Sequence, residues 1–451
     1  MRQLIPAILF LTATICAAPG EIVNAIKAGA VGDGATLNTA AIQKAVDACS
    51  ADGGGTVQFP PGRFVTGTIQ LKDNVTLRLD ENAVLLGSTN AADFRNLDPF
   101  MAGDGVPLGY ALIVAAGAKH AGIEGGGTID GQGRELRAAQ TRFTVRPFLM
   151  RWLHCTNVTV KDVHLANPGA WTLNFFQSYD ATVERVTIRT RNTGLANNDG
   201  IDLDSCEKVS ILDCDIESGD DALCLKTTSP LPCRNITASG CKLSTKCNAI
   251  KLGTESLGDF ENISVTNCQI RNTGMAGIAL YCVDGGQMHD VTITGITMNG
   301  VAVPVSVRLG ARLKTFRAGD QPKSPGALRD VTIKDMHVTG ARQIGLLING
   351  ITNHPVENLT LENIQIELAG GGKLSDAQIQ LPEKESSYPE YSMFGKVMPA
   401  YVLFAWHVRG ITFKNVQTTV TQSDARPATI FVDVEGAIPA DFATSSHPTK
   451  Q

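Results

Sequence analysis

A short segment of alternating aliphatic residues recurs about every 26 residues through much of the chain. The first aliphatic residues of its eight copies are Val158, Val183, Val209, Ile236, Ile263, Val291, Val331 and Leu359, spaced by 25, 26, 27, 27, 28, 40 and 28 residues. This period is too short for a four-stranded propeller blade, and no copy has the 3.6-residue apolar period of a helical repeat. The repeat therefore predicts a parallel β-helix whose coils stack about 4.8 Å apart.

Each repeat contains a second short strand whose first and third residues are mostly aliphatic. Because side chains alternate between the two faces of a strand, these residues should point into the coil. The predicted inward stack is Leu173, Ile201, Leu223, Ile250 and Ile278. The second and fourth residues should form two outward columns: Asn174, Asp202, Cys224, Lys251, Ala279 and Ser306; and Phe176, Asp204, Lys226, Gly253, Tyr281 and Arg308. Carboxylates give way to cations along this face, which suits an extended acidic or polyhydroxylated ligand.

Two regions depart from the repeat. Residues 39–49 have apolar residues at helical spacing, and we expect an amphipathic helix that caps the N-terminal end of the solenoid. Residues 369–400 contain Gly, Pro and charged residues without the repeat, which predicts a long loop that is functional or disordered. No linker divides the chain, so we expect one all-β domain over residues 19–451.

The first 18 residues have the pattern of a cleaved export signal, with Arg2, an apolar stretch from Leu4 to Ile15 and small residues at the end. We therefore expect a periplasmic or secreted protein. The net charge of −5 and the absence of a basic run exclude nucleic acid and anionic membranes as partners. We expect a monomer. The cysteines lack metal-ligand spacing, and they suit disulfides or small buried apolar side chains equally well.

Two acidic segments lie one repeat apart: NNDGIDLDS at residues 197–205 and SGDDALCLK at residues 218–226. Asp199 and Asp221 each stand two residues before a predicted strand, so they should stack on adjacent coils with Asp220 beside them. Such closely spaced carboxylates repel one another, and the pKa of at least one must rise. That group can donate a proton while its ionised neighbours activate water, as in glycosidases with carboxylates roughly 5–10 Å apart.

Two other uses of these carboxylates remain open. Aspartates at strand starts often cap turns, which explains an isolated aspartate well but a paired Gly-Asp-Asp poorly. Clustered carboxylates can also bind calcium. The catalytic interpretation explains the pair best.

The acidic segments, followed by STKCNAIKLGTES, resemble glycoside hydrolase family 28, the polygalacturonase family. The segments AVGDGATLNTAAIQKAVDACSADGGGTVQFPPG, RPFLMRWLHCTNVTV and NPGAWTL are similar to the same family, so that the resemblance spans roughly residues 22–435. It implies a right-handed parallel β-helix and an enzyme that hydrolyses α-linked, galacturonate-containing pectic polysaccharide with inversion, without a metal or cofactor. It also implies that Asp220 is the general acid and that Asp199 and Asp221 hold the attacking water.

The chain departs from the family pattern at three places. Lys246-Cys247-Asn248 stands where polygalacturonases have Gly-His-Gly, Ala279-Leu280-Tyr281 replaces an Arg-Ile-Lys triplet, and Asn174 replaces a frequent His. The resemblance therefore implies hydrolysis more firmly than it implies homogalacturonan as the substrate, and rhamnogalacturonan or exo-type cleavage is also open. The candidate substrate-binding residues are Asn198, Asp202, Lys226, Asn248, Lys251, Tyr281 and Arg308.

Two alternative functions share this fold and face. A polysaccharide lyase would use Lys226 or Lys251 as the base that removes a proton beside a uronate. A non-catalytic carbohydrate-binding protein would fit the missing His and Arg-Ile-Lys.

Overall fold

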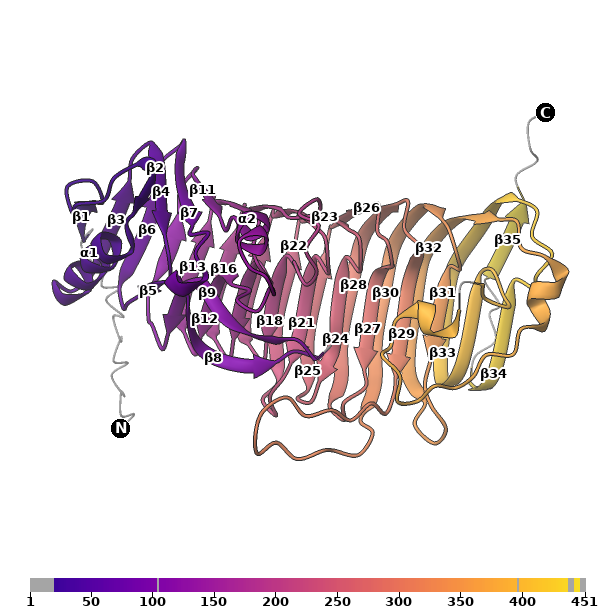
Figure 1. Ribbon diagram of the computed structural model, residues 1–451. Coiled ribbons are helices and arrows are strands. Elements are labelled where there is room, and N and C mark those ends of the chain that lie inside the picture. Colours follow the sequence, from indigo (N-terminus) through magenta and orange to yellow (C-terminus); the bar gives the residue numbers. More distant parts are fainter. Residues whose placement is uncertain (1–19, 104, 396, 437–441, 447–451) are drawn as a thin grey trace, which may run out of the picture.

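Each coil of the chain contributes one strand to each of three parallel stacks, as the computed structural model shows (Figure 1). The structure describes residues 20–103, 105–395, 397–436 and 442–446, and the predicted export signal lies outside them. The first stack, here called the site stack, is β5 (Ile69–Leu71), β9 (Pro107–Ala116), β12 (Phe148–Leu153), β15 (Leu173–Phe176), β18 (Ile201–Asp204), β21 (Leu223–Thr227), β24 (Ile250–Ser256), β27 (Ala276–Cys282), β29 (Val303–Leu309), β31 (Leu346–Asn349), β33 (Leu403–Gln422) and β34 (Thr429–Glu435).

Two further stacks complete the coils. The second is β1 (Glu21–Asn24), β3 (Gly55–Phe59), β6 (Val75–Leu79), β10 (Gly122–Glu124), β13 (Thr156–Lys161), β16 (Tyr179–Glu184), β19 (Glu207–Leu212), β22 (Cys233–Ser239), β25 (Phe260–Thr266), β28 (Gln287–Asn299), β30 (Ala327–Ala341) and β32 (Val356–Gly370). The third is β2 (Asp33–Leu37), β4 (Gly62–Thr66), β7 (Ala83–Gly87), β11 (Thr128–Asp130), β14 (His164–Ala166), β17 (Thr187–Arg189), β20 (Asp215–Ser218), β23 (Lys242–Thr245), β26 (Gln269–Arg271) and β35 (Phe442–Ser446). The long strands from β28 onward bend from the second stack into the third.

The register of the site stack confirms the predicted inward stack. Leu173 pairs with Ile201, Ile201 with Leu223, Leu223 with Ile250 and Ile250 with Ile278. These side chains are completely buried in a single hydrophobic core that runs the length of the solenoid. The sequence repeat therefore corresponds to one coil.

Asparagine residues bend the coils at recurring positions. Asn157, Asn235, Asn262 and Asn358 all have left-handed backbone conformations, which asparagine adopts more readily than most residues. Asn262 donates its side-chain amide to the Asn235 oxygen one coil earlier, 2.7 Å away. These asparagines therefore supply both the bend and a polar contact between coils.

Helix α1 (Thr39–Ala51) occupies the predicted helical segment and lies at the N-terminal end of the solenoid (Figure 1). It buries Ile42, Ala45, Val46 and Cys49. Its presence is confirmed, whereas its role as a cap stays a prediction. The other helical segments are α2 (Gly133–Ala138), η1 (Ala91–Asp93), η2 (Leu374–Gln378) and η3 (Tyr391–Phe394). No helix in the described ranges is long and apolar enough to cross a membrane.

Three segments lie over the outward face of the site stack, and we call them the first (residues 95–103), second (310–326) and third (371–395) cover segments. The first contains β8 (Arg95–Met101), which runs antiparallel to β9. Arg317 of the second forms an ion pair with Asp98 of the first at 2.9 Å. Lys314 of the second donates to the carbonyl of Gly103 at 2.8 Å. Segments more than 200 residues apart in the sequence thus meet beside the site stack.

The third cover segment is attached to the last coils. Arg308 donates to the carbonyl of Glu383 at 2.7 Å, and His407 of β33 lies 3.0 Å from the Glu383 carboxylate. The predicted long loop is therefore an ordered covering layer that includes η2 and η3. Because these segments cover the site stack, its outward columns lie in the correct register but are largely shielded from solvent.

The ten described cysteines are free thiols, and nine of them are buried. Cys214, Cys241 and Cys268 occupy successive coils within the core. Of the two interpretations that the sequence left open, the structure supports small buried apolar side chains.

We expect core truncation to destabilise the solenoid much more than truncation in a cover segment. Leu361→Ala empties a completely buried position of β32 and should lower the free energy of unfolding by about 2–5 kcal/mol. Leu374→Ala is the matched control, since Leu374 is 70% exposed, and it should change stability by less than about 0.5 kcal/mol. Urea denaturation followed by circular dichroism measures both variants. Equal midpoints would contradict the assigned core.

Candidate active site

The three predicted catalytic aspartates line one pocket on the site stack. Asp199 comes just before β18, and Asp220 and Asp221 come just before β21 on the next coil. The other lining residues are Ala102, Gly103, Trp171, Asn197, Lys226, Glu255 and Tyr388. The pocket encloses about 40 Å³, or about 320 Å³ with its open mouth included. The strand register thus brings the carboxylates together, and the cover segments supply part of the wall.

Asp221 is held as a carboxylate by three donors. Its Oδ1 accepts hydrogen bonds from the Asn248 backbone at 3.0 Å and the Asn248 side chain at 2.9 Å, and its Oδ2 lies 2.9 Å from Lys251 Nζ. Burial alone would raise the pKa of Asp221, but Lys251, Lys226 and the Asn248 amide lower it below its usual value. Asp221 is therefore ionised at neutral pH.

Asp220 lies in a different environment although it is the adjacent residue. It is partly exposed at the pocket, and its Oδ1 accepts a hydrogen bond from the Asp221 backbone at 3.0 Å. Burial and the nearby charge of Asp221 raise the pKa of Asp220. A carboxyl group that keeps its proton beside an ionised one is the combination that general acid–base catalysis requires.

Asp199 shares the ammonium of Lys226 with two other carboxylates. Lys226 Nζ lies 3.3 Å from Asp199, 3.4 Å from Asp202 and 3.7 Å from Glu255. Burial and the charge of Asp202 raise the pKa of Asp199 well above its usual value. Its Oδ1 is buried and has no hydrogen-bond partner among the described residues. Asp199 therefore retains an acceptor for a ligand hydroxyl or water, but the pocket favours its protonated form.

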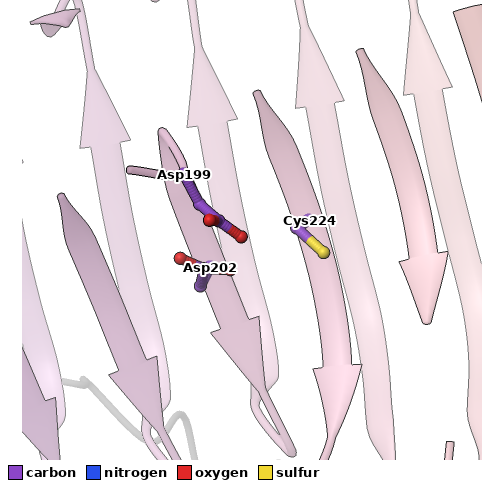
Figure 2. Close-up of side chains that lie close together, drawn as sticks. All are labelled: Asp199, Asp202 and Cys224. Carbon is purple, nitrogen blue, oxygen red and sulfur yellow. The ribbon is translucent and has the colours of Figure 1, made fainter. Parts of the chain in front are cut away.

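Asp199 and Asp202 lie close to Cys224 of the neighbouring strand, as Figure 2 shows. One possible ligand atom from each of these residues lies within 4.8 Å of the other two. Burial raises the pKa of the Cys224 thiol well above its usual value, so it is not a thiolate. The Lys226 ammonium already provides the positive charge beside both carboxylates. This group of residues is therefore better suited to an internal ion pair than to a metal.

Glu255, Tyr388 and Glu390 belong to the site but were not predicted from the sequence. Glu255 lies at the end of β24 and lines the pocket beside Gly103. Tyr388 and Glu390 come from the third cover segment. Glu390 lies 3.2 Å from Lys251 and accepts a hydrogen bond from Asn248 at 3.1 Å. The length of the predicted loop was the one sequence signal for the last two residues.

Lys226 is the one predicted substrate-binding residue that lines the pocket. Lys251 and Asn248 lie behind Asp221 and bond to it, so the prediction that they contact substrate is replaced by a role in holding Asp221. Asp202 is completely buried beside Lys226. The side chains of the predicted outward columns are shielded from solvent, and their carboxylates and ammonium groups pair with one another.

The other three predicted substrate-binding residues lie away from the pocket. Asn198 donates to the Thr190 carbonyl and the Thr193 hydroxyl, so it holds the loop that carries Asp199. Tyr281 is completely buried and donates to Ser306 at 3.1 Å. Arg308 is occupied by carbonyl groups of Gly350, Glu383 and Lys384. These contacts engage all three side chains within the protein, away from the residues that line the pocket, so the structure gives no support to their predicted contact with substrate.

Neither Lys226 nor Lys251 suits the lyase alternative. Burial alone would lower the pKa of each ammonium, but the carboxylates around each one raise it well above the usual value. An elimination base must be neutral before it accepts a proton. Both lysines are therefore firmly protonated and act as counter-ions.

Comparison with known proteins agrees with this geometry. A sequence model of glycosyl hydrolases family 28 matches residues 49–387. A probable polygalacturonase of Vitis vinifera is 28% identical over 374 residues, which cover 76% of this chain and 74% of the relative.

Two solved structures share the fold. The polygalacturonase of Erwinia carotovora ssp. carotovora superimposes with a TM-score of 0.63 at 25% identity, covering 78% of this chain and 94% of that one. A family 28 exopolygalacturonase of Yersinia enterocolitica superimposes with a TM-score of 0.68 at 19% identity, covering 95% of this chain and 78% of that one.

Asp202→Asn should flatten the pH dependence of stability. Burial raises the pKa of Asp202 to about 7, so the folded protein holds a proton there that the unfolded chain releases above about pH 4. This contribution to stability is complete below that lower pKa and is lost as the pH rises through about 7. The variant should therefore show a higher urea midpoint than the parent at pH 7.5 and a smaller difference at pH 4.5. Exposed Asp213→Asn is the matched control, and a pH profile of Asp202→Asn that runs parallel to that of the parent would contradict the assignment.

Proposed function

The chain belongs to glycosyl hydrolases family 28, and we propose that it cleaves a glycosidic bond of pectic polysaccharide in the pocket that Asp199, Asp220 and Asp221 line. The observation that carries the proposal is the unequal environment of two adjacent carboxylates. Asp221 has three donors and a lowered pKa, whereas Asp220 has a raised pKa and stands at the accessible side of the pocket. The polygalacturonase named among the relatives supports a pectic substrate.

The proposed reaction is a single displacement with inversion. Asp220 gives its proton to the oxygen of the leaving sugar as the bond from that oxygen to the anomeric carbon breaks. A water molecule forms the new bond to this carbon from the opposite side, and its proton passes to the carboxylate of Asp221. The cycle ends with Asp220 ionised and Asp221 protonated, and proton exchange with solvent restores both.

Asp199 has a different part in this scheme. Because its pKa is raised, it serves better as a hydrogen-bonding partner that orients the water than as the proton acceptor. Asp221 takes that role because Lys251 and Asn248 keep it ionised. This division revises the expectation that both residues act as ionised carboxylates.

The cover segments support cleavage from a chain end rather than within a chain. Arg317 and Asp98 connect the second and first segments, and Arg312 of the second lies over the Tyr388 ring of the third at 5.7 Å. A site for internal cleavage needs a cleft that is open in both directions along the polysaccharide. Here three segments meet around a small pocket, which suits the terminal part of a chain.

The proposal extends to the location, oligomeric state and domain organisation of the protein. An enzyme that degrades pectic polysaccharide must meet a polymer outside the cell, and the sequence of residues 1–18 suits export. We propose a periplasmic or secreted monomer whose residues 19–451 act as one catalytic β-helix domain.

Asp220→Asn tests the general acid. It should lower kcat on a pectic oligosaccharide by about 10²–10⁴-fold, since proton donation contributes that much, while KM stays near the parent value. The loss should shrink on a substrate with a good leaving group, because that group needs no proton. Asp213→Asn, an exposed aspartate in the bend between β19 and β20, is the matched control.

Proton NMR of the first product supplies an independent check of this mechanism. The product should have the inverted anomeric configuration, because water attacks from the face opposite the leaving group. Retention of configuration, or normal turnover by Asp220→Asn, would refute the assignment of Asp220.

End-wise cleavage predicts a slow fall in viscosity. New reducing ends should accumulate from a polymeric pectic substrate well before its viscosity drops, and the first product should be a mono- or disaccharide. Arg317→Ala removes the contact between the first two cover segments and should lengthen the early products. Exposed Arg409→Ala, on the last coils, is the control. A rapid viscosity loss by the parent enzyme would contradict the proposal.

A further inference from the structure

We infer that the sugar held against the catalytic carboxylates is uncharged, either a neutral glycosyl residue or a methyl-esterified uronate, and that Glu255 enforces this choice. The inference rests on the proposed function and specifies the substrate at the same pocket. It departs from the sequence expectation that Lys226, Lys251 and Arg308 receive a uronate.

The charge of the residues around the pocket does not favour a uronate. The lining residues comprise four carboxylic acids, Asp199, Asp220, Asp221 and Glu255, and one ammonium group, Lys226. Asp202 and Glu390 add two more carboxylic acids behind this layer, and Lys251 adds one ammonium group. Asp221 and Glu255 have lowered pKa values and are ionised, whereas the pKa values of Asp199, Asp202, Asp220 and Glu390 are raised, so the two ammonium groups are matched by two carboxylates. A uronate carboxylate placed here would therefore find no surplus positive charge in a poorly solvated site.

The two lysines are already paired with carboxylates of the protein. Lys226 Nζ lies within 3.7 Å of three carboxylates and 4.3 Å from the centre of the Trp171 ring. Lys251 Nζ lies within 3.2 Å of Asp221 and Glu390. A uronate that competed for either ammonium group would release an acid buried in the protein. That exchange replaces an internal ion pair with a like-charge contact and gains little.

Arg312 of the second cover segment also has a partner within the protein. Its Nε and Nη2 donate to the two oxygens of Asp284 at 2.8 and 2.5 Å, and both side chains are buried. The Nη1 of Arg312 is buried without a hydrogen-bond partner among the described residues, but Arg312 does not line the pocket, so it contributes to the field around Glu255.

The hydrogen bonds that the pocket can make also suit an uncharged sugar. Asp199 Oδ1 is buried, lines the pocket and has no partner among the described residues. A sugar hydroxyl group can pair with this oxygen in either protonation state of Asp199, because a hydroxyl group both donates and accepts. A uronate carboxylate supplies acceptors alone at neutral pH, whereas a methyl ester removes the charge and leaves the ring hydroxyls unchanged.

Glu255 is the residue that discriminates between a charged uronate and an uncharged sugar. Burial alone would raise its pKa, but Lys226, Arg312 and Lys251 lower it to about 2, so it is ionised throughout the working pH range. Gly103 of the first cover segment packs directly against it: a Cβ atom on Gly103 would stand 1.9 Å from Glu255 Oε1. The close approach holds the carboxylate in place at the wall. Glu255 takes no part in the proposed proton transfers, so its effect is on selectivity.

The experiment compares kcat/KM of the parent enzyme on three oligosaccharides of matched length. These are an oligogalacturonate, its fully methyl-esterified form, and a rhamnogalacturonan I fragment that ends in a neutral sugar. We expect at least one uncharged-end substrate to exceed the free oligogalacturonate by about tenfold or more. Preference for the ester identifies a masked uronate, and preference for the rhamnogalacturonan fragment identifies a neutral sugar.

Glu255→Gln tests the residue itself. It should raise kcat/KM for the oligogalacturonate relative to the methyl ester by about tenfold, because one fixed negative charge is removed. The control is Glu81→Gln, an exposed glutamate in the N-terminal coils, which should leave the ratio unchanged.

The outcomes separate the two proposals. If the oligogalacturonate is the best substrate of the parent enzyme, this inference fails and the proposed hydrolysis stands. If all three oligosaccharides resist cleavage, the proposed function fails and this inference fails with it. The comparison among substrates of the parent enzyme decides the matter even if Glu255→Gln does not fold.

Discussion

The parallel hydrogen-bond register between neighbouring coils is the constraint from which the site follows. It pairs Asp202 with Cys224 and Cys224 with Lys251, and it pairs Asp204 with Lys226. Each coil adds one side chain to a column at a spacing of about 4.8 Å, so a short polar motif on one coil necessarily faces the corresponding motif on the next. A slip of one residue would send the carboxylates into the core and the aliphatic residues outward. Continuous burial of the inward stack therefore fixes the positions of the carboxylates.

Crowding of charge on this rigid frame produces groups with different protonation states. Asp221 is surrounded by donors from the next coil and stays ionised, whereas Asp220, its neighbour in sequence, lacks them. Lys226 and Lys251 bind the acids and thereby limit their mutual repulsion. The same pairing occupies both ammonium groups, and the proposed preference for an uncharged sugar follows from it.

The cover segments turn an exposed sheet face into a pocket. The ion pair of Arg317 with Asp98 and the hydrogen bond from Lys314 to Gly103 connect coils that lie far apart in sequence. Tyr388 completes the rim from the other direction, and Glu390 enters the network behind Asp221. Because the solenoid itself provides a stable core, these irregular segments can shape access and selectivity without holding the fold together.

The sequence by itself determined the β-helix, the stacking of Asp199 on Asp221 and the raised pKa of at least one carboxyl group, because a strict repeat translates directly into register. It also predicted that residues 369–400 form a long loop, either functional or disordered. The tertiary structure decided which polar residues reach the pocket, so Tyr281 and Arg308, which were expected there, lie away from it, and Glu255 and Glu390 were missed. A sequence repeat predicts contacts between adjacent coils. Contacts such as Arg317 with Asp98, or Glu390 with Lys251, join segments 219 and 139 residues apart and leave no periodic trace in the sequence.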